Sequence, residues 1–283
     1  MTPPATTLRR FDPGRAGEVA ALCVLAVIVL AAVFAPYVAP HDPLAQDLMN
    51  ILQPPFATAA HPLGTDFLGR DILSRIIYGA QPPLLVGAFS VLLALVIGVP
   101  LGILSGWRDG WVDTAVGRLA DIQMSIPGLV LALLVLAMLG KYLFLVVLII
   151  ALESWPLHYR VVRAYVQTVR GNGYIEAAKL AGVGPVGITV RHLLPGVVPL
   201  LAVTATANVA TAVLAEAALS YLGMGVVPPT PDWGSMVAEG QTQLSGAWWI
   251  SVMPGLALIA LLLSVQLIGN RISSGQSLGG RDR

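Results

Sequence analysis

Six segments of this sequence are apolar over about twenty residues each, and this feature limits the fold more than any other. A transmembrane helix needs roughly 20 apolar residues to cross about 30 Å of hydrocarbon. We therefore expect an all-α membrane protein with six transmembrane helices. The predicted spans lie at 17–38, 82–105, 122–139, 142–162, 197–219 and 248–269.

Two details shape this six-span prediction. The apolar run at 17–38 is longer than the core of a cleaved signal peptide, which is about 7–15 residues, so we interpret it as an uncleaved span. The apolar region from 122 to 162 is too long for one crossing and is interrupted only at Gly140-Lys141. A lysine in mid-bilayer costs roughly 3 kcal/mol, so a hairpin tip is the expected place for Lys141.

Composition agrees with a membrane protein and excludes other classes. Hydrophobic residues make up 56% of the chain and charged residues 11%, whereas soluble domains carry about 25% charged residues. The formal net charge of +1 excludes the strongly basic surface of a nucleic-acid-binding protein. Cys23 is the only cysteine, so the chain has no internal disulfide and no cysteine-based metal site.

The distribution of basic residues predicts the orientation. In the six-span arrangement, thirteen of the sixteen Lys and Arg residues fall on one side, and only Arg70, Arg75 and Lys141 fall on the other. The basic side is expected to be cytoplasmic. This places a tail at 1–16, the loop at 173–195 and a tail at 271–283 in the cytoplasm. A segment at 39–81 is then external, and 82–270 forms a five-helix core.

Two segments on the external side suggest a docking surface for another protein. The first, at 39–81, is rich in aspartate and proline and ends in a short amphipathic helix, on which Asp66, Arg70, Asp71 and Arg75 are predicted to form exposed ion pairs. The second segment, SYLGMGVVPPTPDWGSM at 220–236, holds prolines that stiffen the backbone. The alternative is that this loop is only a neutral connector. The predicted docking residues are Asp66, Arg70, Asp71, Pro228, Pro229, Asp232 and Trp233.

The loop GYIEAAKLAGVGPVGITVRHLLP, at 173–195, is unlike the rest of the chain because it resembles part of a soluble protein. Helix-forming residues precede Gly182, a favoured residue at a helix C-terminus. A second helix is expected to carry Arg191 and His192 until Pro195 stops it. A helix of two turns is unstable alone in water, so it needs a partner. Small Ala177 and Ala178 permit close approach, and Glu176 can meet a basic group.

This loop resembles the EAA loop of the membrane subunits of binding-protein-dependent ABC importers. The pattern comprises Glu176-Ala177-Ala178, Gly182 and Pro195. HPLGTDFLGRDILSRIIYGA and ALSYLGMGVVPPTPDWGSM are similar to segments of the C-type permeases of dipeptide and oligopeptide importers. The end of the last span departs from that family, because Gly269-Asn270-Arg271-Ile272 replaces its usual Gly-Asp-Gly-like turn.

The resemblance implies a type I ABC importer permease fold in the bacterial inner membrane, with the loop as a coupling helix. Its partners would be a paralogous permease, one or two cytoplasmic ATPase subunits and an external peptide-binding protein. ATP and Mg²⁺ would bind to the ATPases, and this chain would bind no cofactor and catalyse no reaction. The sequence agrees, since no G-x-x-x-x-G-K-[ST] motif is present.

Polar residues within the spans are candidates for a substrate path: Thr204, Asn208, Thr211, Glu216 and Glu153. Hydrogen bonding between helices is the alternative for the first three. A proton-coupled secondary transporter would use Glu153 or Glu216 as the proton carrier but would leave the loop at 173–195 without a purpose. An ABC importer of nickel chelates or glutathione is a further alternative.

The four histidines, His41, His61, His158 and His192, are far apart in the sequence. We therefore predict no metal site. His192 is expected to belong to the coupling region.

Overall fold

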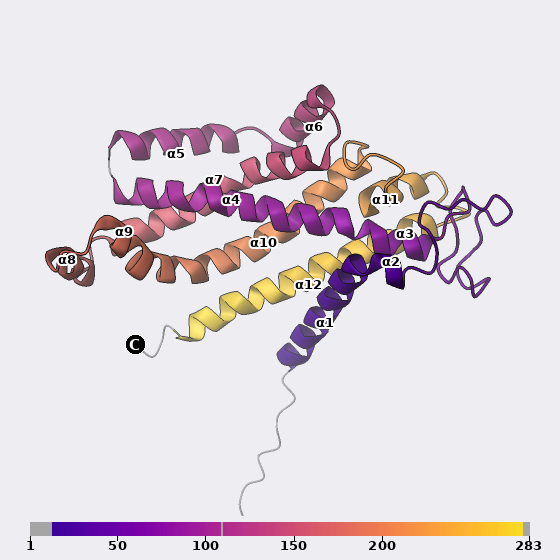
Figure 1. Cartoon of the computed structure of the whole chain (residues 1–283), viewed down its shortest axis with the longest axis horizontal. Helices are drawn as coiled ribbons and strands as arrows, with labels where there is room; N and C mark the ends of the chain where they lie inside the picture. The colour runs from indigo at the N-terminus through magenta and orange to yellow at the C-terminus, as the bar shows by residue number, and fades with distance from the viewer. Residues whose placement is uncertain (1–12, 109, 280–283) are drawn as a thin grey trace, which may run out of the picture.

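The computed structural model is an elongated bundle of helices (Figure 1). It describes residues 13–108 and 110–279, and no β-strand occurs in these ranges. The basic residues Arg9, Arg10, Arg281 and Arg283, used above to predict orientation, lie outside them. In chain order the elements are α1 (Pro13–Val33), α2 (Ala35–Val38), α3 (Ile72–Gly79), α4 (Gln81–Trp107), α5 (Trp111–Met124), α6 (Gly128–Leu139), α7 (Leu143–Val169), α8 (Gly173–Leu180), α9 (Pro185–Ile188), the π-helical turn η1 (Thr189–Leu193), α10 (Leu194–Tyr221), α11 (Trp233–Gln241) and α12 (Trp249–Gly279).

Four of the described helical stretches are long and apolar enough to cross a membrane: Ile72–Trp107, Leu143–Val169, Pro185–Tyr221 and Trp249–Ile272. The helix Gly17–Val33 is apolar but shorter. The pair α5 and α6 passes the same test only when taken together, with a bend of 82° between them. Helix α12 continues through most of the segment that the sequence suggested as a tail after residue 270.

The predicted span at 122–139 is the one that the structure changes most. The helix begins earlier, at Trp111, and breaks after Met124, and α6 starts only at Gly128. Pro127 explains the break, because the residue before a proline avoids the helical conformation and the proline lacks an N–H group. The hairpin tip predicted at Gly140-Lys141 is present between α6 and α7, with Gly140 at a φ of +100°.

Helices α4 and α7 form the most extensive helix pair in the bundle. Three glycines spaced four residues apart on α4, Gly98, Gly102 and Gly106, face α7. A Cβ atom added to Gly102 would lie 2.7 Å from Val162 Cβ, and one on Gly106 would lie 2.7 Å from Val166 Cβ. Such small residues let two membrane helices approach closely, so this stripe explains the tight pairing.

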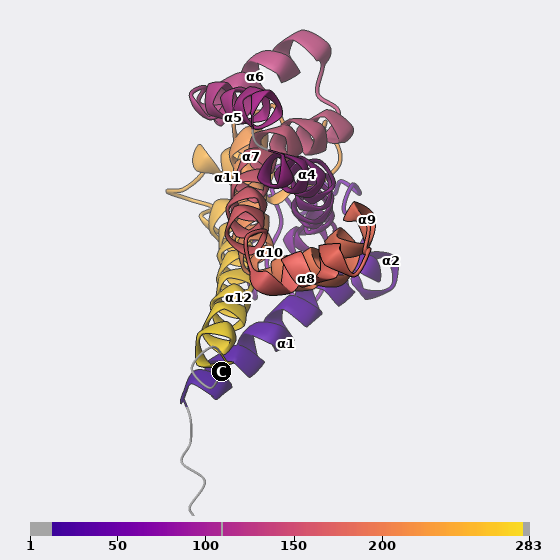
Figure 2. The same cartoon turned by 90° about the vertical axis from the view of Figure 1, so that its left-hand side faces the viewer.

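The bundle has two different ends (Figure 1). Helices α8 and α9 lie at one end, which we call the α8 end. The segment 39–71, α3 and α11 lie at the other, which we call the α11 end. Helix α1 packs against α12, and the view in Figure 2 shows α5 and α6 on the opposite side of the molecule from α1.

Candidate functional site

Helix α8 ends in a Schellman motif. The Val183 N–H donates to the Ala178 carbonyl and the Gly182 N–H donates to the Lys179 carbonyl, both at 3.0 Å. These two bonds define the motif, which requires a left-handed residue after the helix. Gly182 supplies it with a φ of +80°. A Cβ on Gly182 would touch nothing within 4 Å, so glycine is needed there for its backbone conformation and not for space.

One buried side chain attaches α8 to the bundle. Ile175 is completely buried in a cluster with Val162, Val166 and Val169 of α7 and Leu193 of η1. Two further contacts are made by side chains of α8 around Ile175. The Lys179 ammonium lies 4.8 Å from the centre of the Trp107 ring, and the Tyr174 and His192 rings are 6.1 Å apart. The short helix is therefore positioned at the ends of α4 and α7.

The other face of α8 is exposed. Glu176, Ala177 and Ala181 are open to solvent and Ala178 is half-buried. The sequence did not single out Leu180 and Val186, yet their exposed fractions are 90% and 76%. The signal for Leu180 in the sequence was an apolar residue at the end of a helix whose other residues follow the pattern of an exposed face. Small, acidic and apolar side chains together form a surface suited to a protein partner.

Pro195 does not stop a helix, contrary to the sequence prediction. The helical path continues from Pro185 to Tyr221, and Pro195 occupies the first turn of α10. The π-helical turn η1 precedes it, in which the Leu194 N–H donates to the carbonyl of Thr189, five residues back. Pro195 follows at the start of α10, where a missing N–H is tolerated. Arg191 is exposed on this turn and His192 is half-buried.

The polar stripe on α10 mainly bonds to α7. Asn208 is buried and its amide nitrogen lies 3.0 Å from His158 Nε2, while Ser154 donates to Asn208 Oδ1 at 3.1 Å. Thr204 Oγ1 lies 3.3 Å from His158 Nδ1. Thr211 is exposed and bonds to the Ala207 carbonyl. Asn208 and Thr204 therefore form hydrogen bonds between helices, which was the alternative to a role in the substrate path.

Glu216 lies deep in the molecule near the end of α10. It is 1% exposed and accepts a hydrogen bond of 2.9 Å from Ser220. The carboxyl of Asp232, also buried, interacts with it, and burial raises the pKa of Asp232. One oxygen of each carboxyl has no hydrogen-bond partner among the described residues. Two buried carboxyl groups that interact cannot both carry a charge at low cost.

Glu153 occupies a different environment and does not approach Glu216 in the described contacts. It is exposed and lines a cavity of about 170 Å³ between α7 and the α5–α6 pair. Gln123, beside it, accepts a hydrogen bond of 2.8 Å from Trp155 and donates to the Leu152 carbonyl. The five candidate substrate-path residues are thus divided among four separate environments.

The charged residues predicted to form an exposed docking surface at the α11 end are buried instead. Asp66 Oδ2 accepts hydrogen bonds from Arg70 Nε at 2.6 Å and Arg75 Nη1 at 2.5 Å. Both arginines also reach Glu239 Oε2 on α11, at 3.2 and 3.0 Å. Asp66 and Arg70 precede α3 and do not lie on it.

Three more predicted docking residues cap helices or pack in the core. Asp71 and Asp232 accept from the N–H of Ser74 and Ser235 and so cap α3 and α11. Trp233 is 2% exposed, and its Nε1 donates to the Ile76 carbonyl. Pro228 and Pro229 alone among the predicted docking residues are exposed. The expectation of an exposed charged surface is therefore wrong, because the charged side chains are buried and bond to other groups within the fold.

Two family models match this chain. Residues 98–277 match the model described as binding-protein-dependent transport system inner membrane component, and residues 17–55 match the N-terminal transmembrane domain of oligopeptide transport permease C. The first match covers α8, its glycine turn and the polar network of α7 and α10.

Several curated proteins are similar along most of the chain. A di/tripeptide transport system permease protein, DppC, from Pseudomonas aeruginosa is 40% identical over 90% of this chain and 85% of its own length. A probable D,D-dipeptide transport system permease protein from Escherichia coli is 37% identical, covering 88% and 83%. A glutathione transport system permease protein from Escherichia coli is also 37% identical, covering 93% and 86%.

A solved structure has the same fold. The inward-facing methionine ABC transporter MetNI aligns with a TM-score of 0.60 at 22% identity, covering 72% of this chain and 97% of the matched chain. The fold is thus that of a type I ABC importer permease. Together with the family model and the curated relatives, this places the chain in the family of binding-protein-dependent transport system inner membrane components.

Proposed function

We propose that this chain is one of two related permease subunits of an ATP-driven importer of short peptides. The paralogous permease supplies the other half of the pore. One or two cytoplasmic ATPase subunits bind ATP and Mg²⁺, and an external peptide-binding protein delivers the cargo. This chain itself binds no nucleotide and hydrolyses nothing.

The exposed face of α8 is the observation that carries this proposal. Its backbone is locked by the Schellman motif and its base is anchored by Ile175, yet Glu176 and Leu180 contact solvent. A rigid element with an unoccupied surface can transmit the movement of a partner to the helices below it. ATPase closure would thus move α8 and, through η1 and α10, switch the pore between inward-facing and outward-facing states.

The same proposal assigns the sides of the membrane. The α8 end and both termini face the cytoplasm, as the excess of basic residues at that end favours. The α11 end faces outward, where the exposed Pro228 and Pro229 remain available to the binding protein.

Short peptides are the cargo that the relatives favour. Two of the relatives described above are named for dipeptides or tripeptides, and one for glutathione, which is itself a tripeptide with a γ-linkage. Glutathione is therefore the second candidate cargo. The alternative was a proton-coupled secondary transporter, in which Glu153 or Glu216 would have carried the proton. Membership of the binding-protein-dependent transport family favours an ATP-driven importer over that alternative.

The subunit composition is tested by a pull-down of the tagged chain from its native membrane in gentle detergent, followed by mass spectrometry. We expect a second permease and ATPase subunits to be recovered with it. Recovery of this chain alone, under conditions that keep a known ABC complex intact, would contradict the proposal.

The role of α8 is tested by uptake of a labelled dipeptide in cells. Glu176→Lys and Gly182→Pro are expected to leave membrane insertion intact and to abolish uptake. Gln46→Lys adds a positive charge at an exposed position of the α11 end and should leave uptake near the wild-type level. Normal uptake by both α8 variants at normal abundance would refute the coupling role. Competition by unlabelled glutathione distinguishes the two cargoes.

A further inference from the structure

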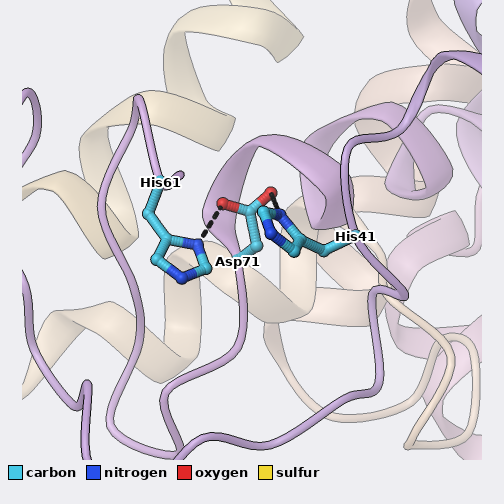
Figure 3. Close-up of side chains that lie close together, drawn as sticks. All are labelled: His41, His61 and Asp71. Carbon is cyan, nitrogen blue, oxygen red and sulfur yellow. Dashed lines mark hydrogen bonds and ion pairs between the residues drawn. The ribbon is translucent and has the colours of Figure 1, made fainter. Parts of the chain in front are cut away.

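Two histidines that are distant in the sequence meet at the α11 end. His41 follows α2, His61 lies in the loop before α3, and Asp71 caps α3 (Figure 3). The two imidazole rings are 4.7 Å apart. His61 Nδ1 lies 3.0 Å from Asp71 Oδ1, and His41 Nδ1 lies 3.9 Å from Asp71 Oδ2. Distance in the sequence, the reason for predicting no metal site, therefore does not separate this pair in the fold.

The spacing of these groups fits a metal ion. One ligand atom from each of the three residues can be chosen so that all lie within 4.8 Å of one another. Ligand atoms at about 2.0–2.1 Å from a tetrahedral Zn²⁺ ion lie roughly 3.3 Å apart. The imidazole nitrogens lie 3.0 Å and 3.9 Å from the two Asp71 oxygens, and the three ligand atoms are at most 4.8 Å apart, so side-chain rotations that shorten the wider separations would close the site.

Part of the site is already held in place by neighbouring groups. Asp71 Oδ2 accepts hydrogen bonds of 2.7 Å from both the N–H and the hydroxyl of Ser74. The same Ser74 hydroxyl oxygen accepts from the backbone N–H of His41 at 3.0 Å. Metal-binding carboxylates are typically oriented by such second hydrogen bonds. Ser74 therefore links two of the three candidate ligands.

His41 has an unused ligand atom. Its Nδ1 is buried and has no hydrogen-bond partner among the described residues, although the side chain as a whole is 38% exposed. A buried imidazole nitrogen without a partner is costly unless something binds to it. His61 is 12% exposed and Asp71 is 1% exposed, so the site is enclosed on one side and open on the side of His41.

We propose that His41, His61 and Asp71 bind a single Zn²⁺ ion at the α11 end. Two neutral imidazoles and a carboxylate are a donor set that Zn²⁺ prefers, whereas Mg²⁺ and Ca²⁺ require mainly oxygen ligands. Three protein ligands leave the fourth position for water or an incoming group. His41 also lines a groove together with Asp42, Tyr78 and Pro231. The ion fastens the segment 39–71 to the start of α3.

Titration of the purified full-length chain with Zn²⁺ in detergent, followed by calorimetry, tests this site. The purification tag must contain no histidine. We expect one Zn²⁺ per chain and no comparable binding of Mg²⁺. His41→Ala and His61→Ala should each weaken Zn²⁺ binding at least about tenfold, since each removes a ligand. His192→Ala removes a histidine at the α8 end and should bind Zn²⁺ like the wild type.

His41→Ala is the decisive variant because its Nδ1 makes no hydrogen bond that the fold would lose. A Zn²⁺-dependent rise in the unfolding temperature is expected in the wild type and is expected to disappear in His41→Ala. Cobalt substitution should give the visible spectrum of a four-coordinate ion in the wild type only. Absence of Zn²⁺ binding by the wild type, or equal binding by His41→Ala, would refute the site.

Discussion

The two ends of this molecule use charged residues in opposite ways. At the α8 end, Glu176 and Arg191 are exposed and α8 is held mainly by Ile175. At the α11 end, Asp66, Arg70 and Arg75 are buried and bonded to one another. The sequence alone suggested charged docking surfaces at both ends. The difference teaches that a cluster of charges marks a docking surface only when no partner for it exists within the same chain.

The network at the α11 end balances its charges. Asp66 and Glu239 supply two negative charges, and Arg70 and Arg75 supply two positive ones. Glu239 lies on α11, 169 residues beyond Arg70, so the network joins the segment before α3 to the far part of the chain. Buried pairs of this kind add little net stability, but removal of one member leaves an uncompensated charge.

Removal of Arg75 is expected to have the largest effect on stability. Arg75→Ala leaves Asp66 and Glu239 without one of their two arginine partners, and the expected cost is about 3–5 kcal/mol of unfolding free energy. Arg118→Ala, at an exposed arginine of α5, should change stability little. Thermal unfolding of the purified variants in one detergent measures both. Equal midpoints for the two variants would mean that the buried network is not required.

The second largest effect is expected at the glycine stripe of α4 that faces α7. A Cβ on Gly102 would approach Val162 Cβ at 2.7 Å and the Tyr159 carbonyl oxygen at 2.8 Å. Gly102→Ala should therefore separate α4 from α7 and cost about 1–3 kcal/mol. Gly255→Ala is the matched control on α12, where the nearest atom to a new Cβ is 3.9 Å away. The same unfolding measurement should show little change for the control, and a loss as large as that of Gly102→Ala would contradict the close-packing argument.

Local features could be predicted from the sequence, and long-range ones could not. The turn at Gly182 and the hairpin tip at Gly140 follow from glycine and from the cost of placing Lys141 in lipid, both of which are readable within a few residues. The burial of Asp66 depends on Glu239, and the meeting of His41 with His61 depends on the path of a whole loop. Neither has a signature in a short window of sequence.

The break before α6 is an intermediate case. Pro127 was visible in the sequence, but the apolar run around it was long enough to be taken as one span. Hydropathy outweighed the local rule for proline, and the structure shows that the local rule was the better guide. Among the predicted substrate-path residues, Asn208 illustrates the converse, because its partner His158 lies on another helix.

Two similar glycine turns allow a direct comparison of the ends. Gly182 follows α8 and Gly223 follows α10, with φ values of +80° and +76°, and a Cβ on either would have no neighbour within 4 Å. An alanine in this conformation costs roughly 1–2 kcal/mol at each site. Unfolding midpoints should therefore fall equally, whereas dipeptide uptake should fall further for Gly182→Ala. Equal uptake at equal abundance would show that the α8 turn has no special role in coupling.

The smallest expected effect concerns pH at the α11 end. Burial raises the pKa of Asp232 above its value of about 3.9 in an unfolded chain. Between these two values the folded protein binds more protons than the unfolded one. The contribution of this carboxyl to stability is therefore complete below the unfolded pKa and is lost as pH rises through the folded pKa.

A pair of amides in place of the two carboxyls should remove this pH dependence. The Asp232→Asn substitution keeps a cap on α11, because asparagine is as good an N-cap as aspartate. Because the Glu216 carboxyl interacts with Asp232, the test uses the double variant Glu216→Gln, Asp232→Asn, which removes both carboxyls. Unfolding midpoints measured from about pH 4 upward should fall more steeply in the wild type than in the double variant. Parallel curves would mean that the two buried carboxyls keep the same protonation in the folded and unfolded states, and this pair would then add no pH dependence to the stability of the α11 end.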